Sequence, residues 1–303
     1  MNFKKYTTWG LAINLLLITS TSVAQTYKSS SWSTNFYLGG SNLLGDLGGS
    51  RFIGNRGVFD YNIRANRLAL GTGLTMNTGA FSVGLNVLGT RLVSNDAYSR
   101  QNFQVARNLN VRTNLVEVSL LGEIRPFSRS AGFNRFYVYS GIGGIYFKPM
   151  SKLNDEWYDL RQVGTEGQYL ENGPGPYSEI DIVIPYGIGY KFRLAKSTSL
   201  LLDLGFRKTF TDYLDDVSTV YADPAQLNAA QPNIPVSQLA DKSEVPNAIG
   251  YERGNPKNDD QYFIIGLKFE YILGGKSGDG CYYNRNPPKT RSTRINQRKM
   301  FTR

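Results

Sequence analysis

The stretch "QYFIIGLKFEYILGG", residues 261 to 275, decides the fold because polar and apolar residues alternate along it. Lys268 and Glu270 lie on one face, and the opposite face carries the apolar residues Phe263, Ile265, Leu267, Phe269, Tyr271 and Leu273. A period of two predicts a β-strand. In a soluble sheet the apolar face would pack on a core, whereas in a membrane β-barrel it would face lipid around a polar lumen.

The rest of the chain repeats this alternation and favours the membrane barrel. It predicts eight strands, at about 34–42, 67–77, 80–93, 114–125, 136–147, 178–194, 199–212 and 261–273. The strand at 136–147 has aromatic residues and glycines on both faces, so its facing is ambiguous. The other cores approach or exceed the length of about 9–11 residues that a tilted strand needs to cross a bilayer.

The lengths of the connections also favour a barrel that spans the outer membrane. Short links at 77–80, 125–135 and 194–199 alternate with long ones at 43–66, 94–113, 148–177 and 213–260. In outer-membrane barrels the short turns are periplasmic and the long loops are extracellular. We therefore predict an all-β, eight-stranded, antiparallel up-and-down transmembrane barrel in the outer membrane, with both termini in the periplasm.

Charged residues on the predicted inner faces indicate an ion network inside the barrel. They are Glu117, Glu123, Arg125, Lys191, Asp203, Arg207, Lys268 and Glu270. The interior of an eight-stranded barrel is narrow enough for side chains to fill it, so the predicted lumen is closed and is not a pore. Removing one member of a buried ion pair is expected to cost roughly 3–5 kcal/mol.

The two ends of the chain differ from the predicted barrel at 25–273. Lys4 and Lys5, an apolar run at 11–18 and the small residues before Gln25 predict a Sec signal peptide at 1–24. The tail at 274–303 carries eight basic residues and one acidic residue, a net charge of +7 within a chain of formal charge +10. The basic character of the protein therefore belongs to the tail.

Composition argues against an enzyme. The chain has no histidine, so no Ser-His or Cys-His nucleophile can form, and the commonest metal ligand is missing. Barrels that process lipid A acyl chains at their rim generally depend on a histidine beside a serine, which makes that alternative weak. We predict a non-enzymatic protein that needs no cofactor.

The tail is the candidate partner-binding segment. Cys281 is the only cysteine, and an odd cysteine in an exported chain suggests a bond to another chain or a free thiol. The candidate contact residues are Cys281, Tyr282, Tyr283, Arg285, Lys289, Arg291 and Arg294. Export argues against nucleic acid as the ligand. The alternatives are a disulfide to a periplasmic partner, or a tail that lies on anionic membrane lipid beside a free thiol.

Two kinds of loop motif could carry chemistry. "TDYLDDVS" places Asp212, Asp215 and Asp216 at the mouth of a long loop, where carboxylates could bind Ca²⁺. The spacing matches no calcium loop, so capping of a strand end or pairing with Arg207 and Lys208 is the favoured interpretation. The glycine-rich "GGSNLLGDLGG" and "GTEGQ" do not lead into a predicted helix that could hold phosphate, and we interpret both as loops.

Several stretches together resemble the PorG family, the outer-membrane barrel component of the type IX secretion system of Bacteroidota. They are "GGSNLLGDLGGSRFIG", "ARNLNVRTNLVEVSLLGE", "YVYSGIGGIYFKP", "WYDLRQVGTEGQ", "YSEIDIVIPYGIGYKF" and "GFRKTFTDYLDDVSTVY". The resemblance implies an outer-membrane anchor for a periplasmic ring built from the lipoprotein PorK and from PorN. It assigns no site residues. A general structural or adhesin-like barrel, whose long loops bind external ligands, is the alternative.

Overall fold

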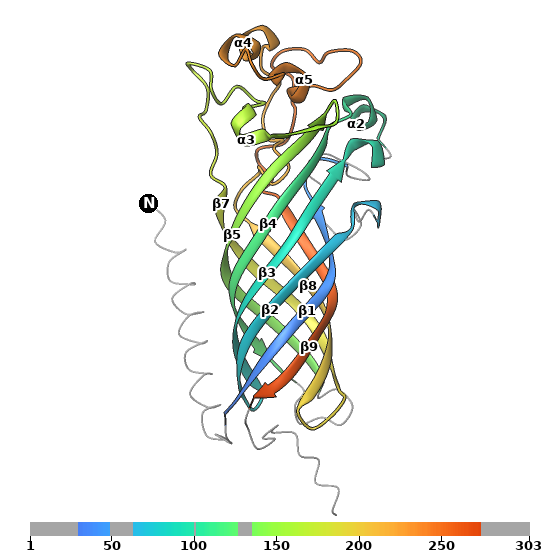
Figure 1. Ribbon diagram of the computed structural model, residues 1–303, viewed down its shortest axis with the longest axis vertical. Coiled ribbons are helices and arrows are strands. Elements are labelled where there is room, and N and C mark those ends of the chain that lie inside the picture. The colour runs from blue at the N-terminus through green and yellow to red at the C-terminus, as the bar shows by residue number, and fades with distance from the viewer. Residues whose placement is uncertain (1–29, 49–62, 100, 127–134, 274–303) are drawn as a thin grey trace, which may run out of the picture.

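The computed structural model describes residues 30–48, 63–99, 101–126 and 135–273 as one β-barrel (Figure 1). Eight long strands form its wall: β1 (Ser31–Leu44), β2 (Arg67–Thr78), β3 (Phe81–Asn95), β4 (Asn110–Ile124), β5 (Phe136–Leu153), β7 (Ile180–Arg193), β8 (Thr198–Thr209) and β9 (Gln261–Leu273). The predicted signal peptide at 1–24 and the tail at 274–303 lie outside the described residues.

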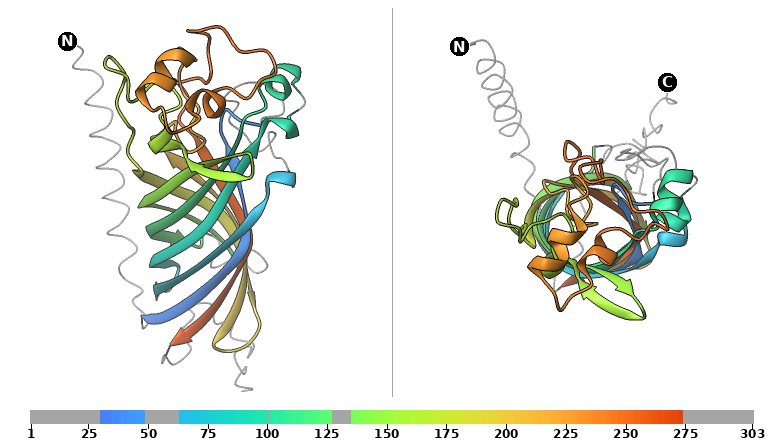
Figure 2. Two further views of the ribbon diagram at one scale, coloured as in Figure 1. Left: turned by 45° about the horizontal axis from the view of Figure 1, so that its top comes forward. Right: turned by 90° about the horizontal axis from the view of Figure 1, so that it is seen from above.

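Antiparallel pairing closes the eight long strands into a ring, which Figure 2 shows from above. Each strand pairs with its neighbours in the sequence, and β1 pairs with β9 through a register that joins Trp32 to Leu273 and Leu44 to Gln261. The short strand β6 (Glu156–Asp159) pairs with the end of β5 and stands outside this ring. The predicted eight-stranded antiparallel barrel is therefore confirmed.

Side chains alternate across most of the barrel wall, except near the crown, where Phe263 is buried together with Tyr262 and Ile264. On β9, Leu267 and Phe269 are exposed whereas Lys268 and Glu270 are buried. The strand at 136–147, ambiguous in the sequence, turns Tyr137 and Tyr139 inward and exposes outward-facing residues such as Ile142 and Tyr146. A wall of exposed apolar side chains around a polar interior suits a bilayer, because burying that surface in lipid removes it from water.

Glycines on the inner faces of β7 and β8 make room for aromatic rings of β5. A Cβ atom at Gly189 would collide with the ring of Tyr137, and one at Gly205 would collide with Tyr139. The absence of side chains at these positions therefore lets the two tyrosine rings lie against the inner faces of β7 and β8. This explains why glycine alternates with apolar residues in "YGIGYKF".

The two ends of the barrel are built differently (Figure 1). The short connections, the start of β1 and the end of β9 lie at one end. The other end carries what we call the crown, the described loop residues 45–48, 63–66, 96–99, 101–109, 154–179 and 210–260. Its short helices are η2 (Ile63–Ala65), η3 (Asp96–Tyr98), α2 (Asn102–Arg107), α3 (Leu160–Val163), α4 (Pro224–Ala230) and α5 (Val236–Ala240).

Strands on the crown side run farther than the sequence predicted. β4 begins at Asn110 rather than at 114, and β5 continues to Leu153 rather than ending at 147. These extensions carry polar residues such as Arg112, Lys148 and Lys152, which hid the continuing strands from a test for apolar residues. None of the helices in the described ranges has the length and apolarity needed to cross a bilayer.

Candidate functional site in the lumen and crown

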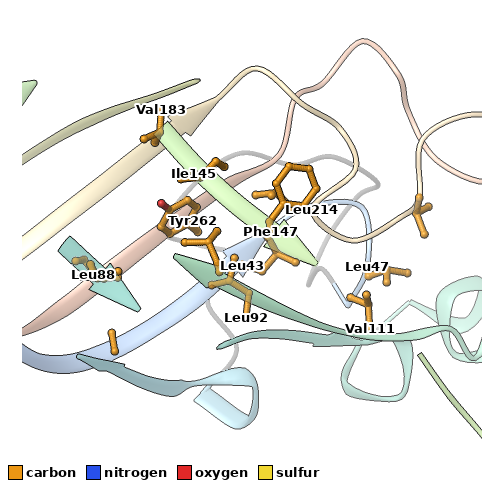
Figure 3. Packing of buried hydrophobic residues seen from close by; sticks show 14 of the residues in the cluster. Leu43, Leu47, Leu88, Leu92, Val111, Ile145, Phe147, Val183, Leu214 and Tyr262 are labelled. Atoms are coloured by element: carbon orange, nitrogen blue, oxygen red, sulfur yellow. The ribbon is translucent and has the colours of Figure 1, made fainter. Parts of the chain in front are cut away.

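An apolar layer closes the barrel where the wall meets the crown (Figure 3). It contains side chains from several strands and from the loop at Leu214, all of them buried: Leu43, Leu47, Leu88, Leu92, Val111, Ile145, Phe147, Val183, Leu214 and Tyr262. This layer separates two polar regions. The lumen network lies on the side of the short turns, and a second buried network lies in the crown.

Glu117 and Arg207 form the best-buried pair of the lumen network. Nε of Arg207 lies 3.1 Å from Oε2 of Glu117, and both side chains are almost inaccessible to solvent. The hydroxyl of Tyr262 donates to the same oxygen at 2.8 Å, and Ser119 donates to Oε1 at 2.8 Å. Side chains from β4, β8 and β9 thus satisfy one carboxylate, which ties three strands together across the lumen.

Two further pairs lie nearer the short turns. Nζ of Lys268 lies 2.8 Å from Oε1 of Glu123. Nζ of Lys191 lies 2.6 Å from Oε2 of Glu270, which also accepts a 2.8 Å hydrogen bond from Ser33 on its other oxygen. The structure therefore brings six of the eight predicted network residues into three pairs. These contacts link strands that are distant in sequence.

The other two predicted network residues have different surroundings. Arg125 follows β4 and donates from Nη2 to the carbonyl oxygen of Gly79 and to Ser82. Asp203 is buried and lines a cavity of about 30 Å³ together with Arg207 and Lys268. That volume suits one or two water molecules rather than a solute. Among the described residues, side chains thus fill the lumen around this small cavity.

Two buried arginines connect the loops of the crown, and neither was predicted from the sequence to have such a role. Nη1 of Arg253 lies 2.8 Å from Oε1 of Glu166, and Nη2 lies 3.8 Å from Oδ2 of Asp216. Arg107 forms a 2.7 Å pair with Asp96 and donates to the carbonyl oxygen of Arg253 at 2.7 Å. Together these contacts join three loops, 96–109, 154–179 and 210–260, and the most distant residues, Asp96 and Arg253, lie 157 positions apart in the sequence.

Backbone amides satisfy much of the remaining negative charge. Asp215 accepts from the amides of Asp46, Leu47 and Val217 at 2.9 to 3.2 Å. Glu166 accepts from the amides of Ser218 and Thr219. The glycine-rich segment around Asp46 therefore serves a buried carboxylate of the crown. The predicted pairing of the acidic residues of "TDYLDDVS" with Arg207 and Lys208 is wrong. Those two bases pair instead with Glu117 and Asp259.

Burial raises the pKa values of several crown carboxyls. Burial first, and then the nearby carboxyls of Asp215 and Asp46, raise the pKa of Asp212 to about 9. Burial and Asp46 raise the pKa of Asp215 to about 8. Burial, and then the carboxyls of Asp215 and Asp212, raise the pKa of Asp260. Neither carboxyl oxygen of Asp212 has a hydrogen-bond partner among the described residues. At neutral pH, raised pKa values favour the protonated, uncharged form of these carboxyl groups, so they need fewer buried cations as partners.

The arrangement does not amount to a metal centre. Across the described residues, no group of three or more histidine, cysteine, aspartate or glutamate side chains could hold a metal ion. The calcium alternative for Asp212, Asp215 and Asp216 therefore has no geometric support. The candidate contact residues of the tail, from Cys281 to Arg294, lie outside the described part of the chain.

Strand pairing and an apolar wall define the class of this protein as an outer-membrane-type β-barrel. A family model described as "Domain of unknown function (DUF6089)" matches residues 12–229, and the chain belongs to that family. A comparison with curated proteins gives no match.

Among solved structures, three small outer-membrane proteins illustrate the likeness. Neisserial surface protein A is 6% identical, with a TM-score of 0.35 over 81% of this chain and 100% of its own. Ail of Yersinia pestis is 9% identical, with a TM-score of 0.39 over 81% and 99%. A major outer membrane protein from Thermus thermophilus is 12% identical, with a TM-score of 0.34 over 80% and 99%. At such scores the fold assignment rests on this chain's own strand pairing.

Proposed function

We propose that this protein is a non-enzymatic outer-membrane component of the type IX secretion machinery, where it anchors a periplasmic ring of PorK-like and PorN-like proteins. One observation supports the resemblance to the PorG family that suggests this role. Asp46, Glu166 and Asp216 come from three of the stretches that carry the resemblance, and Arg107 and Arg253 connect them in one buried network. The likeness therefore concerns parts that fold together.

A binding role also fits the interior of the barrel. Glu117, Glu123 and Glu270 each contact a base, so none of these lumen carboxylates is left as an obvious acid or base for catalysis. The apolar layer separates the lumen from the crown. We therefore propose that the protein acts through its two ends, as an anchor, and not through chemistry inside the barrel.

The proposed orientation puts the crown outside the cell and both termini in the periplasm. Trp32 and Leu273 pair with each other at the end of the short turns, so β1 begins and β9 ends on the same side of the barrel. With that side in the periplasm, the tail at 274–303 and its net charge of +7 would meet the ring. An acidic surface on the ring lipoprotein is the proposed docking partner.

Co-purification and a secretion assay test the role. Tagged protein extracted in mild detergent should bring the ring lipoprotein with it, and deletion of the gene should stop export of cargo that carries C-terminal signals. Expression of a chain that ends at residue 275 should restore the barrel but not the ring contact. Normal export in the deletion strain, or recovery of the barrel alone where the ring survives extraction, would contradict the proposal.

Cys281 allows a sharper test of the tail. The periplasm favours disulfides, and we propose an intermolecular bond from Cys281 to the ring partner. Non-reducing electrophoresis of outer membranes, quenched with a thiol blocker, should show a heavier species that disappears on reduction and in Cys281→Ser. A single monomer band, together with maleimide labelling of Cys281 in intact envelopes, would favour a tail that lies on anionic lipid.

An adhesin-like barrel is the second candidate, and the surface of the crown favours it. Val245, Ile249 and Tyr251 are 80%, 63% and 67% exposed on one crown segment, which is more apolar surface than a loop in water needs. Trimming residues 243–250 should abolish attachment to a surface while secretion stays normal if this candidate is right. Loss of secretion instead, with the barrel still folded, would favour the secretion role.

A further inference from the structure

Two arginines face outward on the crown side of the lipid-facing wall. Arg91 of β3 pairs in register with Asn114 of β4, and Nε of Arg91 donates to Oδ1 of Asn114 at 3.0 Å. Arg112 lies two residues from Asn114 on the same strand, so it shares that face. The next two residues of this face toward the middle of the wall are the exposed valines Val116 and Val118. The arginines therefore lie where the apolar wall ends.

These arginines differ from their basic neighbours in having no acidic partner in the described part of the chain. Lys148 pairs with Asp159 at 2.8 Å, and Lys152 pairs with Asp155 at 2.6 Å. No carboxylate of the described residues forms an ion pair with Arg91 or Arg112. Nε of Arg112 is moreover buried without a hydrogen-bond partner. Two like charges at the edge of a region of low dielectric constant are unfavourable unless an anion joins them.

An aromatic platform fixes the orientation of Arg112. Its guanidinium carbon lies 3.6 Å from the centre of the Trp157 ring, which belongs to β6. Figure 2 shows the hairpin of β5 and β6, in light green, projecting sideways from the ring of strands. A guanidinium stacked by its face keeps edge N–H groups for an anion, and the fork of a guanidinium matches the oxygens of a phosphate. In Arg112, Nη2 makes a long contact of 3.8 Å with Sδ of Met150, a weak acceptor that a phosphate oxygen can replace. Trp157 is also suited to the boundary between lipid and water.

We propose that Arg91 and Arg112, with Trp157 as a platform, bind the phosphate of a lipid A headgroup in the outer leaflet. Lipid A places a phosphorylated sugar directly above acyl chains, and the structure places two arginines without a described acidic partner directly above an apolar wall. This site goes beyond the secretion role. It rests only on the proposed orientation, with the crown outside the cell.

Native mass spectrometry of the full chain in detergent, titrated with diphosphoryl lipid A, tests the site. Arg91→Gln combined with Arg112→Gln should weaken binding by roughly tenfold for each arginine, as expected for a charge-assisted contact. Lys208→Gln is the matched control, because Lys208 also faces outward near the crown but pairs with Asp259 at 3.7 Å. It should bind like the wild type. Dephosphorylated lipid A should bind to the wild type no better than to the double variant.

Three outcomes would overturn the proposal. Equal binding by wild type and double variant, with both retaining the compact band in unheated gels, removes the site. Equal competition by phosphatidylglycerol shows a general phosphate site and overturns the choice of lipid A. Orientation is checked separately with Glu244→Cys in a Cys281→Ser background, because Glu244 is exposed on the crown. Failure of an impermeant maleimide to label intact cells would put the arginines in the inner leaflet.

Discussion

The lumen and the crown both bury many charges, but they balance them in different ways. In the lumen, three acids meet three bases in separate pairs, and a fourth buried acid, Asp203, lines the small cavity beside two of those bases, Arg207 and Lys268. In the described crown, two buried arginines, Arg107 and Arg253, accompany seven buried carboxyl groups: Asp46, Asp96, Glu166, Asp212, Asp215, Asp216 and Asp260. Strands place opposite side chains across a narrow space, whereas irregular loops can turn their amides toward a carboxylate. Basic side chains therefore compensate the negative charge of the lumen carboxylates. In the crown, backbone amides and protonation compensate the buried carboxyl groups.

The largest effect is expected from Arg253→Met, which removes one of the two buried cations of the crown. Glu166 and Asp216 would lose their base while staying buried, and breaking a buried pair from one side costs about 3–5 kcal/mol. We expect local unfolding, measured as rapid proteolysis within residues 210–260 while the barrel band survives. Arg253→Lys keeps the charge and should show a smaller loss. Unchanged protease resistance in Arg253→Met would show that the amides alone stabilise these carboxylates.

Glu117→Ala should have the next largest effect, in the lumen. It leaves the buried guanidinium of Arg207 without its acid and the hydroxyl of Tyr262 without its acceptor, at a cost of about 3 kcal/mol. The midpoint of the heat-induced gel shift in detergent should fall, while the crown keeps its protease resistance.

The double variant Glu117→Ala with Arg207→Met separates the pair from the packing. Because it removes both charges, it should recover part of the lost stability. If the double variant is less stable than the sum of the single variants predicts, the pair does not act as a unit, and packing of the two side chains dominates.

The lumen was largely predictable from the sequence, whereas the crown was not. A period of two assigns Lys268 and Glu270 to the interior without any knowledge of their partners. No period runs through the crown, so Arg107 and Arg253, which organise it, lack a local signal. Their partners come from distant loops, and only the closed barrel brings these loops together. The glycine-rich motifs of two long connections gave a hint of the crown network. The structure links their residues Asp46 and Glu166 through Arg107 and Arg253.

The facing of a strand could not be predicted where its two faces carry the same residue types. Residues 136–147 place tyrosines and glycines on both faces, and the register with Gly187 and Gly189 of β7 decides which tyrosines point inward. The short strand β6 was missed because it spans only four residues, Glu156–Asp159, too few for a period of two to stand out. It pairs with polar extensions of β5 beyond the bilayer-crossing part.

A pH titration should distinguish the two regions further. A carboxyl group whose pKa is raised on folding stabilises the folded state fully below its unfolded pKa, near 4, and loses that contribution as pH rises to the folded pKa. For Asp212 and Asp215 the folded values are about 9 and about 8, so the crown should lose stability as pH rises across the neutral range. We expect a loss of about 3 kcal/mol between pH 6 and pH 8 for each proton that only the folded crown holds, because each such proton is worth about 1.4 kcal/mol per pH unit.

Proteolysis of the crown at the two pH values measures this loss, after correction for the pH dependence of the protease on an unfolded substrate. Asp212→Asn is the matched control, since its amide cannot ionise, and it should flatten the pH response. A crown that becomes more resistant as pH rises would show that Asp212 is ionised when folded.

The smallest effect is expected from Glu270→Ala, at the short-turn side of the lumen. Its pair with Lys191 is as short as any in the barrel, at 2.6 Å, but the two side chains keep 9% and 15% of their exposure, compared with 2% and 4% for Glu117 and Arg207. Because water can partly replace the lost partner near the rim, we expect about 1–2 kcal/mol rather than the full cost of a buried pair. Melting in detergent measures it. Glu270→Gln, which keeps an acceptor for Ser33, should lose less. Equal losses in Glu270→Ala and Glu117→Ala would mean that depth in the lumen does not control the strength of these pairs, and wild-type melting in Glu270→Ala would remove Glu270 from the stabilising network.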